Sequence, residues 1–204
     1  MSENQDSALS KALNWVIEVD VPAIKGSVDG LKSSNPGLSK EELANTIFSK
    51  AQWKSAASGL VTGLPSNWAT MILAAIGDVA ITLRLEVIAT AKVALLYQPN
   101  FFSNDEAAWE LLVPIFGFNA ISQVMQEAAI KGGQGLSKAA IKKYLSKETL
   151  AQFKKIMLKL FGKKVTQKGI ITKTLPIVGG MIGAVWNWAE VSIIKKRAIK
   201  YFAS

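Results

Sequence analysis

The stretch "GLPSNWATMILAAIGDVAITLRLEVIATAKVALL", residues 63–96, decides the fold. It is apolar almost throughout, but Asp78, Arg84, Glu86 and Lys92 are set into it. A membrane span needs about 20 mostly apolar residues, and a charge at its centre costs a few kcal/mol. Residues 68–83 already contain Asp78, so the apolar run is too short. We therefore expect a long core helix over about residues 68–97.

A second apolar segment, residues 174–189, carries no charge but is interrupted by Pro176, Gly179 and Gly183. The spacing of the two glycines lets another helix approach closely. Apolar residues recur every three or four positions along most of the chain, and no region alternates with period two, which predicts an all-α fold. We expect one compact multi-helix domain over residues 1–204, with these two segments packed together as central helices.

Other helices are predicted from their ends. A first helix over residues 7–19 should stop near Pro22. Residues 34–37 form a turn by composition, and Ser39 with Glu42 makes a capping box for a helix that runs to about residue 58. Further along, Asn104 with Asp105 and Glu106 should cap a helix that runs to about residue 116. The remaining predicted helices cover about residues 119–131, 137–145, 147–161 and 177–202.

Charge is distributed unevenly along the chain. Residues 1–130 hold 8 basic and 13 acidic side chains, whereas residues 131–204 hold 16 basic and 2 acidic ones. This asymmetry predicts that the C-terminal third meets an anionic lipid surface or an acidic protein partner. The loop at residues 132–135 marks the change of sign and is either a hinge or an ordinary surface loop. Scarce arginines and few interleaved aromatic residues argue against nucleic acid.

The two predicted helices of this basic region are amphipathic. An apolar stripe runs through Ile141, Tyr144, Leu145, Phe153, Ile156, Met157, Leu160 and Phe161. Such a pattern suits either a membrane-surface helix or a solvated lysine face over a buried stripe. The candidate surface for an anionic partner consists of Lys142, Lys143, Lys154, Lys155, Lys159, Lys163 and Lys164.

The chain has no cysteine and no histidine. Thiol nucleophiles, disulfides, Cys/His zinc sites and the usual Ser-His-Asp relay are therefore excluded. We expect no cofactor, no metal and no enzymatic activity. The polar start, which includes Glu3 and Asp6, lacks the basic and apolar regions of a secretory signal, so we expect a cytoplasmic protein, peripheral to the membrane if it binds one.

A candidate polar core site lies inside the long helix. Asp78 and Glu86 fall close to one line of the helix, about 12 Å apart by the helical rise, which is too far to share a proton or one metal ion. A buried carboxylate needs a cationic or hydrogen-bonding partner. Asn187 or Arg197 of the last helix could supply it to Asp78, as a structural ion pair or as part of a ligand pocket.

The order of these features resembles the EcsC family of bacterial proteins. The resemblance rests on the Ser-Gly-x-x-x-Gly entry at residues 58–63, on "IATAKVALLYQPN" from residue 88 and on "LPIVGGMIGAVWNWAEVSIIKKRAIKYF" from residue 175. Members often carry "YG.D" where this chain has residues 97–100, Tyr-Gln-Pro-Asn. The matching positions are Gly59, Gly63, Asp78, Tyr97, Pro176, Gly179, Gly183, Asn187 and Arg197.

The family is named for a protein encoded beside an ABC transporter and has no established reaction. The resemblance therefore implies a helical fold and a membrane or secretion context. Our first hypothesis is a non-enzymatic helical protein that associates with membranes, or with a membrane-bound or secreted partner, through its basic C-terminal third. The alternative is a soluble accessory or chaperone-like protein for the products of neighbouring genes.

Overall fold

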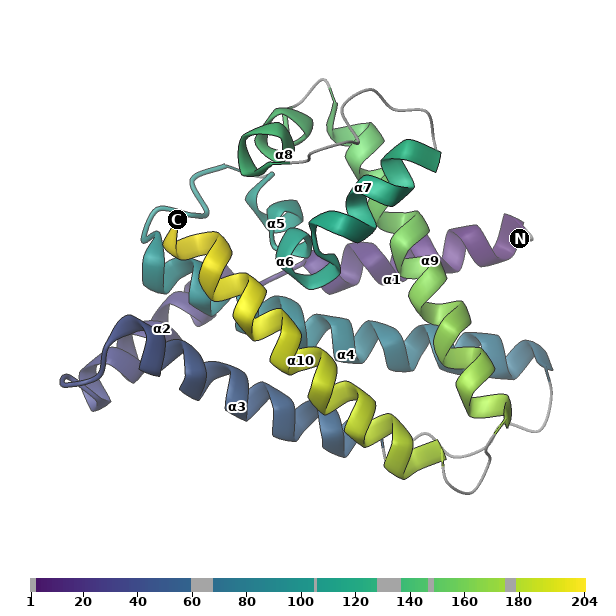
Figure 1. The fold of residues 1–204 in the computed structure, drawn as a ribbon, viewed down its shortest axis with the longest axis horizontal. Helices are drawn as coiled ribbons and strands as arrows, with labels where there is room; N and C mark the ends of the chain where they lie inside the picture. The colour runs from purple at the N-terminus through teal and green to yellow at the C-terminus, as the bar shows by residue number, and fades with distance from the viewer. Residues whose placement is uncertain (1–2, 60–67, 105, 128–136, 147–148, 175–178) are drawn as a thin grey trace.

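The computed structural model describes residues 3–59, 68–104, 106–127, 137–146, 149–174 and 179–204. The fold of these residues is all-helical and contains no strand, so the predicted fold class is confirmed (Figure 1). The helices in chain order are α1 (Glu3–Ile17), α2 (Val21–Ser34), α3 (Lys40–Gly59), α4 (Trp68–Tyr97), α5 (Ala107–Glu110), α6 (Leu112–Phe116), α7 (Phe118–Glu127), α8 (Lys138–Tyr144), α9 (Leu150–Thr174) and α10 (Gly179–Ala203).

The long helix α4 has the bounds that its apolar periodicity predicted. It contacts α1, α2, α3, α6, α9 and α10 and therefore forms the centre of the core. Figure 1 shows α10 crossing the molecule beside α3, and α10 also contacts α4. The expected contact between the two long apolar helices is thus present, although the side chains of residues 175–186 lie outside the described part.

The N-terminal region contains a helix that the sequence analysis missed. The apolar face of α1 is buried as expected, and α1 ends at Ile17. Pro22 was predicted to end a helix, but it lies in the first turn of α2. Amide hydrogens in a first turn have no partner within the helix, so the missing one of proline costs no hydrogen bond. Asp20 caps this helix, because its Oδ1 accepts the amide hydrogen of Ala23 at 2.9 Å.

The predicted start of α3 is confirmed in detail. The amide of Ser39 donates to Oε2 of Glu42 at 2.8 Å, and the amide of Glu42 donates to Oγ of Ser39 at 3.2 Å. These two bonds are the reciprocal pair of a capping box. The Ser39 hydroxyl also donates to Oε2 of Glu42, at 2.7 Å, and this bond, followed by the one from the Ser39 amide, lowers the pKa of the Glu42 carboxyl.

The region after α4 differs from the prediction. The expected helix to residue 116 is divided into α5 and α6, and Asn104 does not cap it with its side chain. Glu106 occupies the N-cap position without a side-chain hydrogen bond, and Asn104 contributes only its carbonyl, to Ala107 at 3.3 Å. The cap prediction was wrong because a short acceptor near a helix start can equally serve a turn.

The basic region folds as α8 and a much longer α9. Ser137 caps α8, since its Oγ accepts the amide hydrogen of Ala140 at 3.2 Å. The apolar stripe of both helices is buried, apart from the half-buried Tyr144. The stripe therefore belongs to the core, and most lysines of these helices face solvent. Residues 132–135, which were predicted to form either a hinge or an ordinary surface loop, lie outside the described residues.

Within the described ranges, no single helix is long and apolar enough to cross a membrane. The residues Ala107–Phe116 and Phe118–Glu127 meet the length and composition of a span only as a pair, and that pair is bent by 99°.

Candidate functional site

The predicted polar stripe of α4 lies inside the protein. Asp78 is 6%, Thr82 1% and Glu86 0% exposed. Among the described residues, Oγ1 of Thr82 has no hydrogen-bond partner. Three polar side chains at four-residue spacing therefore penetrate the core along one line of the helix.

Glu86 belongs to a three-residue ionic network that joins α4, α9 and α10. The ammonium of Lys164 lies 3.1 Å from Oε2 of Glu86 and 2.9 Å from Oε1 of Glu190. The Glu86 side chain is fully buried, and those of Lys164 and Glu190 are 17% and 26% exposed. Burial opposes the charge of Lys164, but the two carboxylates outweigh it and raise the pKa of Lys164 above its usual range.

The other two members of the predicted polar core site are engaged elsewhere. The amide of Asn187 donates to the carbonyl of Ser55 at 3.1 Å, which ties α10 to α3. The guanidinium of Arg197 lies 3.4 Å from the carbonyls of Ile115 and Phe116 at the end of α6. A cation suits the negative end of a helix. The contacts of Asn187 and Arg197 are thus with α3 and α6, and Lys164 of α9 contacts Glu86 of the stripe.

The predicted anionic-partner surface is only partly available. Lys164 of this set lies within the ionic network, where it contacts Glu86 and Glu190. Lys159 and Lys163 both bind Glu127, at 2.9 and 3.0 Å, and Lys154 lies over the Trp109 ring at 5.0 Å. The exposed lysines of the set that make no such contact with the described residues are Lys142, Lys143 and Lys155.

A tryptophan pair on the outer face of α3 and α10 was missed by the sequence analysis. Trp53 is 70% and Trp188 40% exposed, and their rings meet edge to face with centroids 5.3 Å apart. Beneath them Nε2 of Gln52 donates to Oγ of Ser192 at 2.6 Å. Two exposed tryptophans on different helices could have been paired only with knowledge of which helices are neighbours.

The two helices that carry this tryptophan pair also carry exposed lysines. Lys50 and Lys54 are exposed on α3, and Lys196 and Lys200 are exposed on α10. Lys92 of α4 lies close to the α3 lysines: burial, and then the charges of Lys54 and Lys50, lower its pKa. We define the α3–α10 face as Lys50, Trp53, Lys54, Trp188, Ile193, Lys196 and Lys200.

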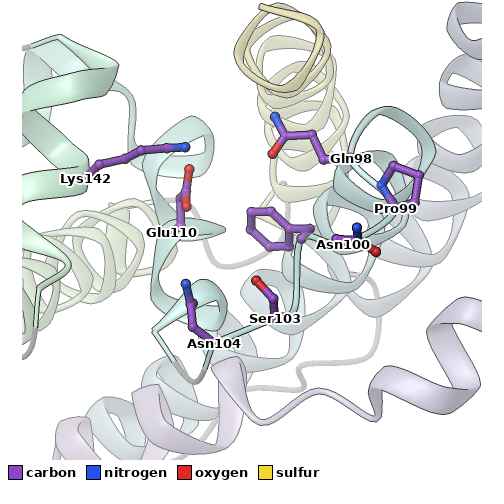
Figure 2. Close-up of a pocket in the computed structure, with 8 residues that line it drawn as sticks. Gln98, Pro99, Asn100, Ser103, Asn104, Glu110 and Lys142 are labelled. Carbon is purple, nitrogen blue, oxygen red and sulfur yellow. The ribbon is translucent and has the colours of Figure 1, made fainter.

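A pocket of about 400 Å³ opens where the segment after α4 meets α5 and α8 (Figure 2). Lys142 of α8 and Glu110 of α5 line one side of it, with their charged ends turned toward one another. Its other lining residues are Gln98, Pro99, Asn100, Phe101, Ser103 and Asn104. The sequence analysis found only Lys142 and Asn104 of this set, each for another role.

Glu110 is held in place by the last helix. The Tyr201 hydroxyl donates to Oε1 of Glu110 at 2.8 Å, and the ammonium of Lys138 donates to the Tyr201 carbonyl at 2.7 Å. Burial and the Glu110 charge raise the pKa of Tyr201 well above its usual range. The phenol therefore stays protonated and keeps orienting the carboxylate.

This raised pKa predicts an alkaline loss of stability. Above about pH 10 the unfolded chain releases the Tyr201 proton while the folded protein retains it, so the free energy of unfolding falls as pH rises. At pH 7, Tyr201→Phe should lower stability by about 1 kcal/mol through the lost hydrogen bond. The difference between the two proteins should shrink between pH 9 and pH 11 in urea unfolding curves. A difference that stays constant over this range contradicts the assignment.

Within the described residues, no three carboxylates lie close enough together to hold a metal ion. Comparisons of the chain with protein-family models, curated proteins and solved structures found no match. The resemblance to the EcsC family therefore stays a prediction based on sequence motifs.

Proposed function

We propose that this protein binds the surface of an anionic membrane peripherally, through α10 of its basic C-terminal third and through α3 beside it. The observation that carries the proposal is the exposed Trp53–Trp188 pair on two helices that also carry exposed lysines. The proposed role is binding rather than catalysis. The resemblance to the EcsC family, which implies a membrane context, supports the same direction.

The tryptophan rings favour a membrane interface because they expose apolar area to water in the unbound protein. A tryptophan side chain buries about 150–250 Å² when covered, at about 25 cal/mol per Å². Covering the exposed part of Trp53 alone would thus contribute roughly 3 kcal/mol. Tryptophan also has a polar N–H, so it prefers the headgroup level of a bilayer to either water or the acyl core.

The lysines of the α3–α10 face provide the matching electrostatic attraction. Each basic residue near an anionic membrane contributes about 1 kcal/mol, and the attraction falls off within a Debye length. Residues 43–59 of α3 contain no carboxylate, and in α10 the carboxylate of Glu190 is bound by Lys164. No acidic group of these two stretches therefore opposes the approach of anionic lipid.

Removal of the two rings should weaken vesicle binding. The variant Trp53→Ala/Trp188→Ala should bind vesicles of phosphatidylcholine with phosphatidylglycerol at least about tenfold more weakly than the unmodified protein, which corresponds to 1.4 kcal/mol or more. Co-sedimentation at low salt measures this. The matched control is Trp15→Ala, because Trp15 is 42% exposed but lies on α1. If the double variant folds poorly, Trp53→Ala alone should still bind these vesicles more weakly than the unmodified protein.

The same assay separates lipid from a protein partner. Binding should fall as salt is raised and should be weak on phosphatidylcholine alone. Lys50→Gln/Lys54→Gln should lower it several-fold, whereas Lys25→Gln/Lys32→Gln on α2 removes equal charge with little effect. Absence of any sedimentation with anionic vesicles at low salt would overturn the membrane proposal and favour an acidic protein partner.

A further inference from the structure

The pocket at the end of α4 brings opposite charges together without pairing them. Lys142 belongs to no ion pair with the described residues, and Glu110 receives one hydrogen bond, from Tyr201. Figure 2 shows the two charged ends beside one another, with Gln98 facing them from the end of α4. A cation and an anion that line one cavity without forming an ion pair can each bind a group of a ligand in that cavity.

The anionic side of the pocket is preorganised. Tyr201 fixes one oxygen of Glu110, and the Tyr201 ring is itself held by Lys138 at 4.9 Å and by Phe202 at 5.0 Å. Phe101 is 8% exposed and meets Phe202 edge to face at 5.2 Å. A carboxylate that is already oriented loses little conformational entropy when it binds a cationic group.

The remaining lining supplies neutral hydrogen-bonding groups. Asn100 and Asn104 contribute side-chain amides, and Ser103 contributes a hydroxyl. Lys142 is the single cation among the lining residues, which fits a carboxylate better than a phosphate of higher charge. The volume of about 400 Å³ is at the lower end of the range for small-molecule sites.

We propose that this pocket binds a small soluble zwitterion that carries one amine and one carboxylate, as an amino acid does. The ammonium of the ligand binds Glu110, and its carboxylate binds Lys142. A ligand with one charge alone contacts only one of these two side chains, so it binds the pocket more weakly. This inference is independent of the proposed membrane binding, since the pocket residues are not part of the α3–α10 face.

Titration calorimetry with a series of ω-amino acids tests the proposal. Glycine, β-alanine and 4-aminobutyrate place the two charges at increasing separations, and at least one should bind in the millimolar range or better. Methylamine and acetate, which carry one charge each, should bind at least about tenfold more weakly, because one charge-assisted hydrogen bond is lost.

Two variants locate the binding. Lys142→Gln should weaken the best zwitterion at least about tenfold, and Lys143→Gln, the exposed neighbour outside the pocket lining, should leave its affinity unchanged. Glu110→Gln should weaken it similarly, with a thermal melt to verify folding. The proposal is overturned if no zwitterion of the series binds at about 10 mM, if acetate binds equally well, or if the two lysine variants behave alike.

Discussion

Replacement of Lys164 by methionine should destabilise the protein by about 3–5 kcal/mol, because it removes a cation that contacts the fully buried Glu86 carboxylate. Urea unfolding followed by circular dichroism measures this loss. Lys163→Met is the matched control: Lys163 is the adjacent residue, and its side chain is 43% exposed in a pair with Glu127. That exposed pair should contribute less than about 1 kcal/mol.

The Lys164 variant should also respond differently to pH. The variant lacks the Lys164 ammonium, so its stability should fall less than that of the unmodified protein as pH rises above about 10. In the unmodified protein the contribution of Lys164 is fully present below its unfolded pKa of about 10.4 and is lost only as pH rises through its raised folded pKa.

A compensating change distinguishes lost charge pairing from lost packing. Glu86→Leu in the Lys164→Met background removes the buried carboxylate that has lost its contact with Lys164. This double variant should therefore recover much of the lost free energy of unfolding. If Lys164→Met and Lys163→Met destabilise the protein equally, the network of Glu86, Lys164 and Glu190 does not stabilise the fold more than an exposed ion pair does.

Gly117→Ala should cost at least about 2 kcal/mol of stability, because Gly117 combines two constraints. Its backbone has φ 81° and ψ 152°, a region open essentially to glycine alone. An added Cβ would also lie 2.8 Å from the Cζ and Nη1 atoms of Arg197. The substitution therefore strains the turn between α6 and α7 and displaces the cation from the end of α6.

The two constraints on Gly117 can be separated by a second variant. If the displaced guanidinium contributes, Gly117→Ala should cost less in an Arg197→Ala background than alone. Gly30→Ala on α2 is the matched control, because a Cβ there meets nothing within 4 Å and its φ is ordinary. It should stabilise the protein by about 0.5–1 kcal/mol. Equal effects of the two glycine substitutions on the urea midpoint contradict the argument.

Much of the local structure follows from the sequence. The bounds of α4, the capping box of α3 and the turn at residues 34–37 depend on interactions within a few positions, so a single sequence contains them. The errors at Pro22 and Asn104 are of the same local kind. Proline can end a helix or begin one, and asparagine can cap a helix or shape a turn, and the flanking residues did not decide between these outcomes.

The site residues required information that a single sequence does not contain. Helical periodicity showed that Asp78 and Glu86 share one line of α4, but it did not show which helix faces that line. Glu86 meets Lys164, 78 positions away, and the Trp53–Trp188 pair and the Glu110–Tyr201 pair likewise join distant helices.

The sequence by itself determined that this chain is helical, that α4 is a core helix with polar residues along one line, and that the C-terminal third is basic. Helix formation, capping and charge depend on residue type and short-range spacing. Only the tertiary structure decided that Lys164 lies within the ionic network rather than on a lysine surface, and that two tryptophans stand together on the outer face. Which side chains meet depends on how separate helices pack, because the surface of one helix can pack against several other helices of the chain.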